Sequence, residues 1–265
     1  MSLQIDSFFI IAVFIFGSII GSFLNVVILR LPNPEESIAF PPSHCPKCSA
    51  HLHWYENIPI ISYLFLRGKC GHCQVRISPQ YPIVELLTAL LGVAVFVQFG
   101  LTLTALGYFI FCCALITIIW IDLHHQIIPD VISLPGIILG FAFSFVSTFV
   151  TWQDSLIGLF SGGAIFYAIS FSYYLFRRQE GLGGGDIKLL AMLGAFLGWQ
   201  SLLFIIFASS VTGTVAGLFA MRTQKKGGAT RIAFGPFLAI SGLFYLLFRP
   251  QVQQLFQLYL NLFSG

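Results

Sequence analysis

Charged side chains are scarce in this chain. Only 9% of its 265 residues are Asp, Glu, Lys or Arg, whereas 57% are hydrophobic; a soluble domain carries about 25% charged residues. Thirteen cations against ten acids leave a formal charge of only +3, so the composition excludes a nucleic-acid-binding protein and a disordered chain. We therefore expect an all-α polytopic membrane protein whose few polar residues carry its function, because polar groups are costly in lipid.

The hydrophobic residues are grouped in long runs. A bilayer core requires about 20 apolar residues per helix, and the sequence predicts about eight transmembrane helices on this basis. The first run follows an N-terminus without Lys, Arg or an Ala-x-Ala-like cleavage site, so it is interpreted as a retained helix and not as a signal peptide. The predicted spans lie near residues 8–29, 82–98, 103–121, 131–150, 156–176, 187–199, 201–221 and 232–248.

Positive charges are divided unequally between the predicted loops. With eight spans and an outer N-terminus, twelve of the thirteen Lys and Arg residues fall on one side of the membrane, and only Arg249 falls on the other. Cytoplasmic loops are enriched in Lys and Arg. We therefore expect the cation-rich side to face the cytoplasm and both termini to lie outside.

The one long polar stretch, residues 30–80, belongs to the predicted cytoplasmic side. It contains Cys45-Pro-Lys-Cys48 and Cys70-Gly-His-Cys73, separated by 21 residues. Two such pairs offer four thiolates in the tetrahedral arrangement that zinc prefers. Because four thiolates leave no open position, zinc here would fold the insertion and take no part in catalysis. A histidine of the same segment could instead replace one thiolate; the candidates are His44, His51, His53 and His72.

Three carboxylates are expected at one membrane depth on the cytoplasmic side. Asp122 ends the third predicted span, Asp130 begins the fourth, and Asp186 begins the sixth directly after three glycines, residues 183–185. Two carboxylates a few ångströms apart can share one proton, so that one activates water while the other protonates the substrate. This is the chemistry of aspartyl proteases. Glycines beside such a pair would let a substrate backbone approach closely.

Which of the acids form the catalytic pair is judged from whether each lies at the start or at the end of a predicted helix. Asp130 follows Pro129 at the start of an apolar helix, where a carboxylate caps free backbone N–H groups. Asp122 ends a helix, where the dipole disfavours a negative charge, and such a placement favours a functional role. Glu85, one turn into the second predicted span, could pair with Arg76 or serve the site.

Eight stretches in the same order along nearly the whole chain together resemble the type IV prepilin peptidase family. They are residues 21–32, 44–48, 56–59, 66–70, 81–87, 122–130, 181–190 and 234–237. The resemblance implies a bacterial inner-membrane aspartyl endopeptidase that removes the leader peptide of prepilins or pseudopilins at the cytoplasmic face. It also implies N-methylation of the new N-terminus with S-adenosylmethionine. By resemblance the catalytic pair is Asp122 and Asp186, and the four cysteines are the family's paired metal motifs.

We expect the chain to divide into a first transmembrane helix (1–29), a zinc-binding insertion (30–80) and a transmembrane peptidase core (81–265). No strand, Gly-rich turn and helix of the soluble nucleotide-binding type is visible, so methyl transfer rests on the resemblance alone. The alternatives are another intramembrane aspartyl protease, a proton-coupled transporter and a zinc-stabilised scaffold. A transporter would place acids near the midplane and repeat its pattern between halves. A scaffold gives no reason for three glycines before Asp186.

Overall fold

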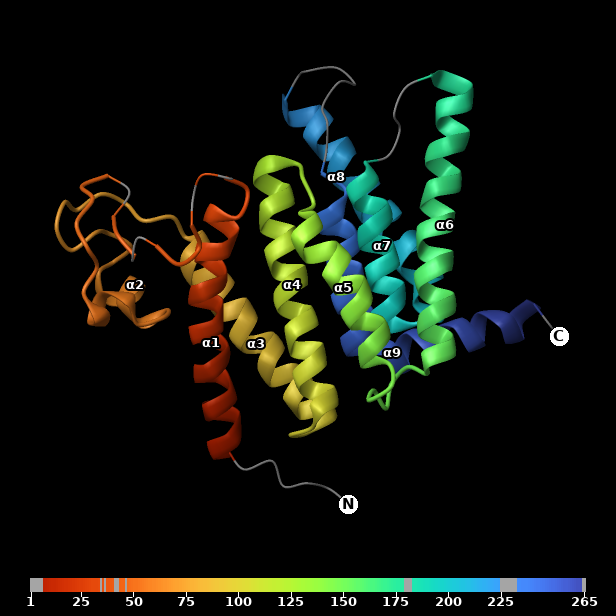
Figure 1. Cartoon of the computed structure of the whole chain (residues 1–265), viewed down its shortest axis with the longest axis horizontal. Coiled ribbons are helices and arrows are strands. Elements are labelled where there is room, and N and C mark those ends of the chain that lie inside the picture. Colours follow the sequence, from red (N-terminus) through yellow and green to blue (C-terminus); the bar gives the residue numbers. More distant parts are fainter. Residues whose placement is uncertain are drawn as a thin grey trace. The chain divides into compact units, whose positions relative to one another are not determined.

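Helices form almost all regular structure in the described part of the chain (Figure 1). The computed structural model describes residues 7–33, 35, 37–40, 43–45, 47–178, 183–224 and 233–263. The elements are α1 (Ser7–Arg30), η1 (Trp54–Asn57), α2 (Ile61–Phe65), α3 (Gln80–Phe99), α4 (Leu103–His125), α5 (Asp130–Phe143), α6 (Trp152–Arg177), α7 (Gly184–Leu197), α8 (Gln200–Gln224) and α9 (Gly235–Phe263). Among the described residues, β-pairing is limited to two isolated bridges. The predicted all-α fold is confirmed.

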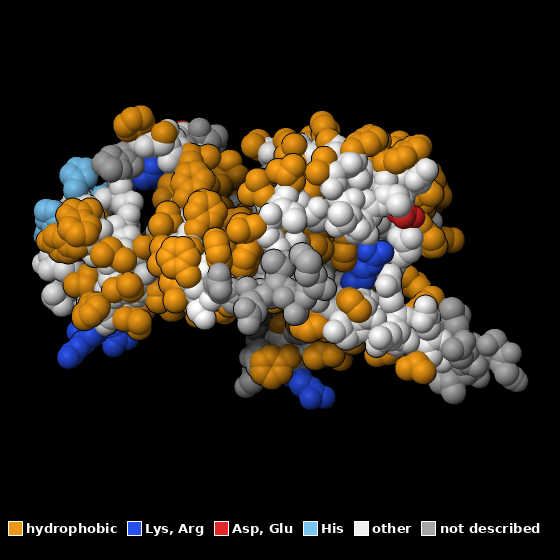
Figure 2. Space-filling view, turned by 90° about the horizontal axis from the view of Figure 1, so that it is seen from below, with side chains coloured by type: hydrophobic (Ala, Val, Ile, Leu, Met, Phe, Trp, Pro, Cys, Tyr) orange, Lys and Arg blue, Asp and Glu red, His pale blue; other side chains and the backbone are white. Residues whose placement is uncertain are grey.

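Five of the described helices are long and apolar enough to cross a membrane. They are α1, α3, α4, α6 and residues Gln200–Arg222 of α8. Many large hydrophobic side chains of these helices are exposed, among them Phe16, Phe160 and Phe207. Hydrophobic side chains with few Lys and Arg among them are also visible on the face drawn in Figure 2. A surface of this kind suits a lipid environment and not water. The chain is a multi-pass membrane protein, but the predicted count of eight spans is not confirmed, since α5 and α7 have only 14 residues each.

The fourth predicted span is wrong in its length. Helix α5 ends at Phe143 and not at residue 150. The hydroxyl of Ser144 donates to the Phe141 carbonyl at 2.6 Å, and the Ser147 hydroxyl accepts the N–H of Phe149 at 3.1 Å. Serine side chains compete in this way with the helical hydrogen bonds of the backbone. Hydropathy alone does not register such a stop.

The chain divides into two compact units, Met1–Thr117 and Ile118–Gly265, with the boundary inside α4. In the first unit α1 packs along α3 (Figure 1). A Cβ on Gly17 would lie 2.8 Å from the Ala89 Cα, and a Cβ on Gly21 would lie 2.6 Å from the Glu85 Cα. The two helices therefore approach at distances that only glycine permits, as small residues four apart allow in membrane helices.

In the second unit α7 is the central helix and packs against α5, α6, α8 and α9. Residues 189–197 are all buried. A Cβ on Gly162 of α6 would lie 2.6 Å from a backbone oxygen of α7, and the Ser155 hydroxyl donates to the Ala195 carbonyl at 2.6 Å. Close packing on several sides fixes α7, and with it the position of Asp186 in its first turn.

Candidate functional site

Asp122 lies in the last turns of α4 and is only 5% exposed. Its carboxylate accepts the backbone N–H of Gly235, the first residue of α9. The approach is close, because a Cβ on Gly235 would lie 2.5 Å from Oδ2 of Asp122. The first N–H groups of a helix have no partner within the helix and favour an anion. The start of α9 therefore compensates for the unfavourable dipole at the end of α4.

Asp186 lies in the first turn of α7, and its carboxylate accepts the N–H of Gly183. Asp122 acts electrostatically on the Asp186 carboxylate. The structure therefore brings these two acids near each other from the ends of two helices. Of the motif at 181–190, residues 181 and 182 lie outside the described part of the chain.

Ile128, in the loop between α4 and α5, packs against Gly185, which precedes Asp186, and against Gly235, whose N–H bonds to Asp122. A Cβ on Gly185 would lie 2.9 Å from the Ile128 Cβ, and a Cβ on Gly235 would lie 3.0 Å from its Cδ1. Both glycines are needed for this packing. Gly184 differs from them, since a Cβ there would meet no described atom within 4 Å. One side of the Asp186 turn is thus closed by Ile128, and space is left at Gly184.

Asp130 has a different role from the predicted one. Helix α5 begins at Asp130 with Pro129 at its N-cap, and no side chain caps the helix. The Asp130 carboxylate instead accepts a hydrogen bond from Lys188 at 2.6 Å, and both side chains are solvent-accessible. The prediction of a capping carboxylate is wrong, because the carboxylate bonds to a cation on α7 and to no N–H group of its own helix.

Glu85 is buried in α3 and contacts the insertion. Its Oε2 accepts the N–H of Ile60 at 2.7 Å. Ile60 has φ of +63°, a conformation that β-branched residues rarely adopt. The ion pair with Arg76, one of the two expectations for Glu85, does not occur among the described residues. Glu85 therefore fixes the turn that precedes α2.

The four cysteines of the insertion lie in two turns with the same backbone geometry. In the first, the N–H of Cys45 donates to the Ala50 carbonyl at 3.0 Å, and the N–H of Ser49 donates to the Cys45 carbonyl at 2.9 Å. The second turn repeats both bonds around Cys70, at 2.9 and 3.0 Å. An antiparallel bridge flanks each turn, His44–His51 and Lys69–Arg76. Two equivalent knuckles thus present their thiols to each other.

The four thiols form one cluster. All Sγ atoms of Cys45, Cys48, Cys70 and Cys73 lie within 4.8 Å of one another, and the Cys45 and Cys73 sulfurs are 3.8 Å apart. The backbone N–H groups of Cys48 and Lys47 lower the pKa of the Cys45 thiol to about 6. This favours the thiolate, which is the form that binds metals. The cluster could hold a metal ion without a histidine ligand.

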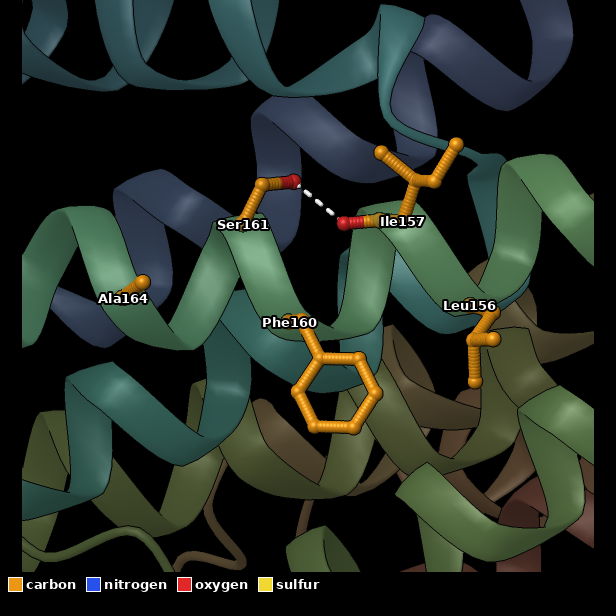
Figure 3. A pocket seen from close by; sticks show the side chains of 5 residues that line it. All are labelled: Leu156, Ile157, Phe160, Ser161 and Ala164. Atoms are coloured by element: carbon orange, nitrogen blue, oxygen red, sulfur yellow. Dashed lines mark hydrogen bonds between the residues drawn. The ribbon is translucent and has the colours of Figure 1, made fainter.

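A shallow apolar hollow on α6 is unrelated to these groups (Figure 3). All its lining residues come from this one helix, and its polar interaction is the bond from the Ser161 hydroxyl to the Ile157 carbonyl at 2.6 Å. It contains no titratable side chain, so it offers no acid–base chemistry. The lining residues are Leu156, Ile157, Phe160, Ser161 and Ala164.

Gly235 was not singled out among the candidate site residues from the sequence. Its only sequence signal is the stretch 234–237, one of the eight that carry the family resemblance. A glycine followed by proline at a helix start is a common pattern. Its contact with Asp122 depends on how α9 packs, and hydropathy carries no information on that.

Comparison with known proteins places these features in a family. Residues 15–99 match the bacterial peptidase A24 N-terminal domain, and residues 109–218 match the type IV leader peptidase family. A protein of Pseudomonas aeruginosa named prepilin leader peptidase/N-methyltransferase is 37% identical over 92% of each chain. Proteins of the same name from Aeromonas hydrophila and Neisseria gonorrhoeae are 37% and 39% identical over 91% and 86% of each chain. No solved structure matches significantly. With this similarity over nearly its whole length, the chain belongs to the type IV leader peptidase family.

Proposed function

We propose that this protein is an aspartyl endopeptidase that removes the leader peptide of type IV prepilins or pseudopilins, with Asp122 and Asp186 as the catalytic pair. The observation that carries the proposal is the electrostatic interaction between these two carboxylates, one near the end of α4 and the other at the start of α7. Each is held by a backbone N–H, from Gly235 and Gly183. The printed name of the similar bacterial proteins supports the substrate class.

The chemistry follows from the proximity of the two acids. Neighbouring carboxylates resist being ionised together, so the pair retains one proton. The ionised carboxylate takes a proton from water, and the water oxygen attacks the scissile carbonyl carbon while the protonated carboxyl donates its proton to the carbonyl oxygen. The carboxyl that took the proton from water then donates it to the leaving amine as the C–N bond breaks, and a hydroxyl of the tetrahedral intermediate returns its proton to the other carboxylate.

The surroundings of Asp186 support access for an extended peptide. The space at Gly184 would let a substrate backbone lie against the enzyme backbone. Asp130 is a weaker candidate for the second acid because Lys188 occupies its carboxylate.

The cysteine cluster is proposed to bind a structural zinc ion. Zinc–thiolate bonds of about 2.3 Å in a tetrahedral site separate the sulfurs by about 3.8 Å, and the Cys45 and Cys73 sulfurs are 3.8 Å apart. With four thiolates the coordination would be complete. Zinc would therefore hold the two knuckles together and so fold the insertion between α1 and α3.

Methyl transfer and topology complete the proposal. The printed name of the relatives includes N-methyltransferase activity, and S-adenosylmethionine is the methyl donor that the resemblance implies. No residue of this chain is assigned to it.

We further propose that the protein lies in the bacterial inner membrane with the two acids facing the cytoplasm. In this proposal the chain consists of a first helix (1–29), a zinc-binding insertion (30–80) and a peptidase core (81–265). The unequal distribution of Lys and Arg supports this orientation.

The test is co-expression with a prepilin in cells without their own leader peptidase, followed by mass spectrometry of the pilin N-terminus. We expect a pilin shortened by its leader, and an added methyl group reports the second activity separately. Cells with the Asp186→Asn variant provide the control, since this variant should insert normally and leave the leader in place. An intact prepilin with the wild-type enzyme would refute the proposal and favour the transporter or scaffold alternatives.

A further inference from the structure

A second cluster of ligand-type side chains lies in the insertion and is separate from the four thiols. It consists of His53 and Glu56, at the η1 turn, and His72, in the second knuckle. Their ligating atoms all lie within 4.8 Å of one another. The cluster therefore joins two segments of the insertion through two imidazoles and one carboxylate.

Glu56 is held firmly in this cluster. Its side chain is 7% exposed, and its Oε2 accepts the N–H of His53 at 2.9 Å. A Cβ on Gly71 would overlap with its Oε1, so the carboxylate rests against the backbone of the second knuckle. No Lys or Arg of the described residues forms an ion pair with it. A buried carboxylate of this kind is stabilised by a cation, because burial without one costs solvation energy.

The histidines surround this carboxylate at the spacing of ligands on a common ion. His72 Nε2 and Glu56 Oε2 are 3.6 Å apart, which is longer than a hydrogen bond. Ligands with metal bonds of about 2.0–2.1 Å in a tetrahedral site are about 3.4 Å apart. The rings of His53 and His72 have centroids 6.0 Å apart and planes inclined by 35°, and His53 also stacks on Tyr55. A shared ion accounts for these distances better than a direct bond.

We propose that His53, Glu56 and His72 bind a second zinc ion. Two imidazoles and a carboxylate are a ligand set that zinc accepts, and three protein ligands leave a fourth position for water or another donor. This site would differ from the four-thiolate cluster, whose coordination is complete. It would also tie η1 to the second knuckle, because its ligands come from both. The inference does not depend on the proposed peptidase activity.

The experiment counts zinc in the full-length protein, purified in detergent without a polyhistidine tag and equilibrated with zinc buffered in the micromolar range. Elemental mass spectrometry should give two ions per chain for the wild type and one for the double variant His53→Ala/His72→Ala. His51→Ala is the matched control, since it removes an exposed histidine of the same insertion from outside the cluster and should keep two.

Cobalt substitution identifies which ion is lost. The thiolate-to-cobalt absorption band should remain in the double variant, which shows that the cysteine cluster is filled and the insertion folded. Should that variant lose the band, Glu56→Gln, which nearly preserves side-chain volume, replaces it in the same count. One ion in the wild type with the thiolate band present would overturn the proposal. Two ions in the double variant His53→Ala/His72→Ala would also overturn the proposal, because the second ion would then lie elsewhere.

Discussion

Replacing Gly235 by alanine tests whether the start of α9 positions Asp122 for catalysis. Gly235 does not have positive φ, so alanine can adopt its backbone conformation, and any effect must come from the added methyl group. That Cβ would lie 2.5 Å from the Asp122 Oδ2, whereas ordinary contacts begin at 3.4 Å. The carboxylate or the helix start must therefore move by about 0.9 Å. Misplacement of a reacting group by about 1 Å can cost about 100-fold in rate, or about 2.7 kcal/mol of transition-state stabilisation.

The assay is the initial rate of leader removal from a purified prepilin in detergent, measured by gel shift and checked by mass spectrometry. Gly163→Ala in α6 is the matched control, because its Cβ would lie 3.8 Å from the nearest atom and should leave the rate unchanged. Equal yield and equal thermal unfolding of the two variants would show that the fold is retained. A Gly235→Ala rate within about threefold of the wild type would refute the proposed positioning of Asp122.

Three further predictions concern the acids, the metal and pH. Asp122→Asn and Asp186→Asn should each abolish leader cleavage in the same prepilin assay, because an amide cannot share the proton, whereas Asp130→Asn should retain it, since an exposed ion pair contributes only about 0–1 kcal/mol. Activity for Asp122→Asn together with inactivity for Asp130→Asn would show that the pair is wrongly assigned. Cys70→Ser should lower both the zinc content and the resistance of residues 30–80 to limited proteolysis, and Cys48→Ser should act in the same direction, because each removes one of four thiolate ligands; less than half an equivalent of zinc in the wild type would contradict the site. The rate of cleavage should pass through a maximum with pH, because it falls at low pH when both carboxyls are protonated and at high pH when both are ionised. The two apparent pKa values of this profile belong to the pair and not to either residue. A rate that stays flat across the acid range would contradict the prediction.

Composition and spacing were sufficient to predict the all-α fold and the cluster of four thiols, and they point to the acids as the groups able to do chemistry. A chain with 9% charged residues in long apolar runs can satisfy its backbone in lipid only as helices or a closed barrel, and runs of helical length favour helices. The Cys-x-x-Cys pairs predicted the thiol cluster because the two short turns around Cys45 and Cys70 are local structures. The acids stand out in the sequence for a different reason, because a carboxylate among apolar residues has few structural explanations.

The tertiary structure decided which of these groups meet. Asp130 and Asp122 both lie at helix ends in the sequence, but only packing brings Lys188 to the first and Gly235 to the second. Glu85 likewise finds its partner at Ile60, 25 residues away in the chain. Such contacts depend on how closely helices approach, which is set by glycines at their interfaces and by side-chain volumes. Periodicity and hydropathy indicate which part of the chain forms a helix and which residues are apolar. They carry no information on the neighbour that a polar side chain will meet.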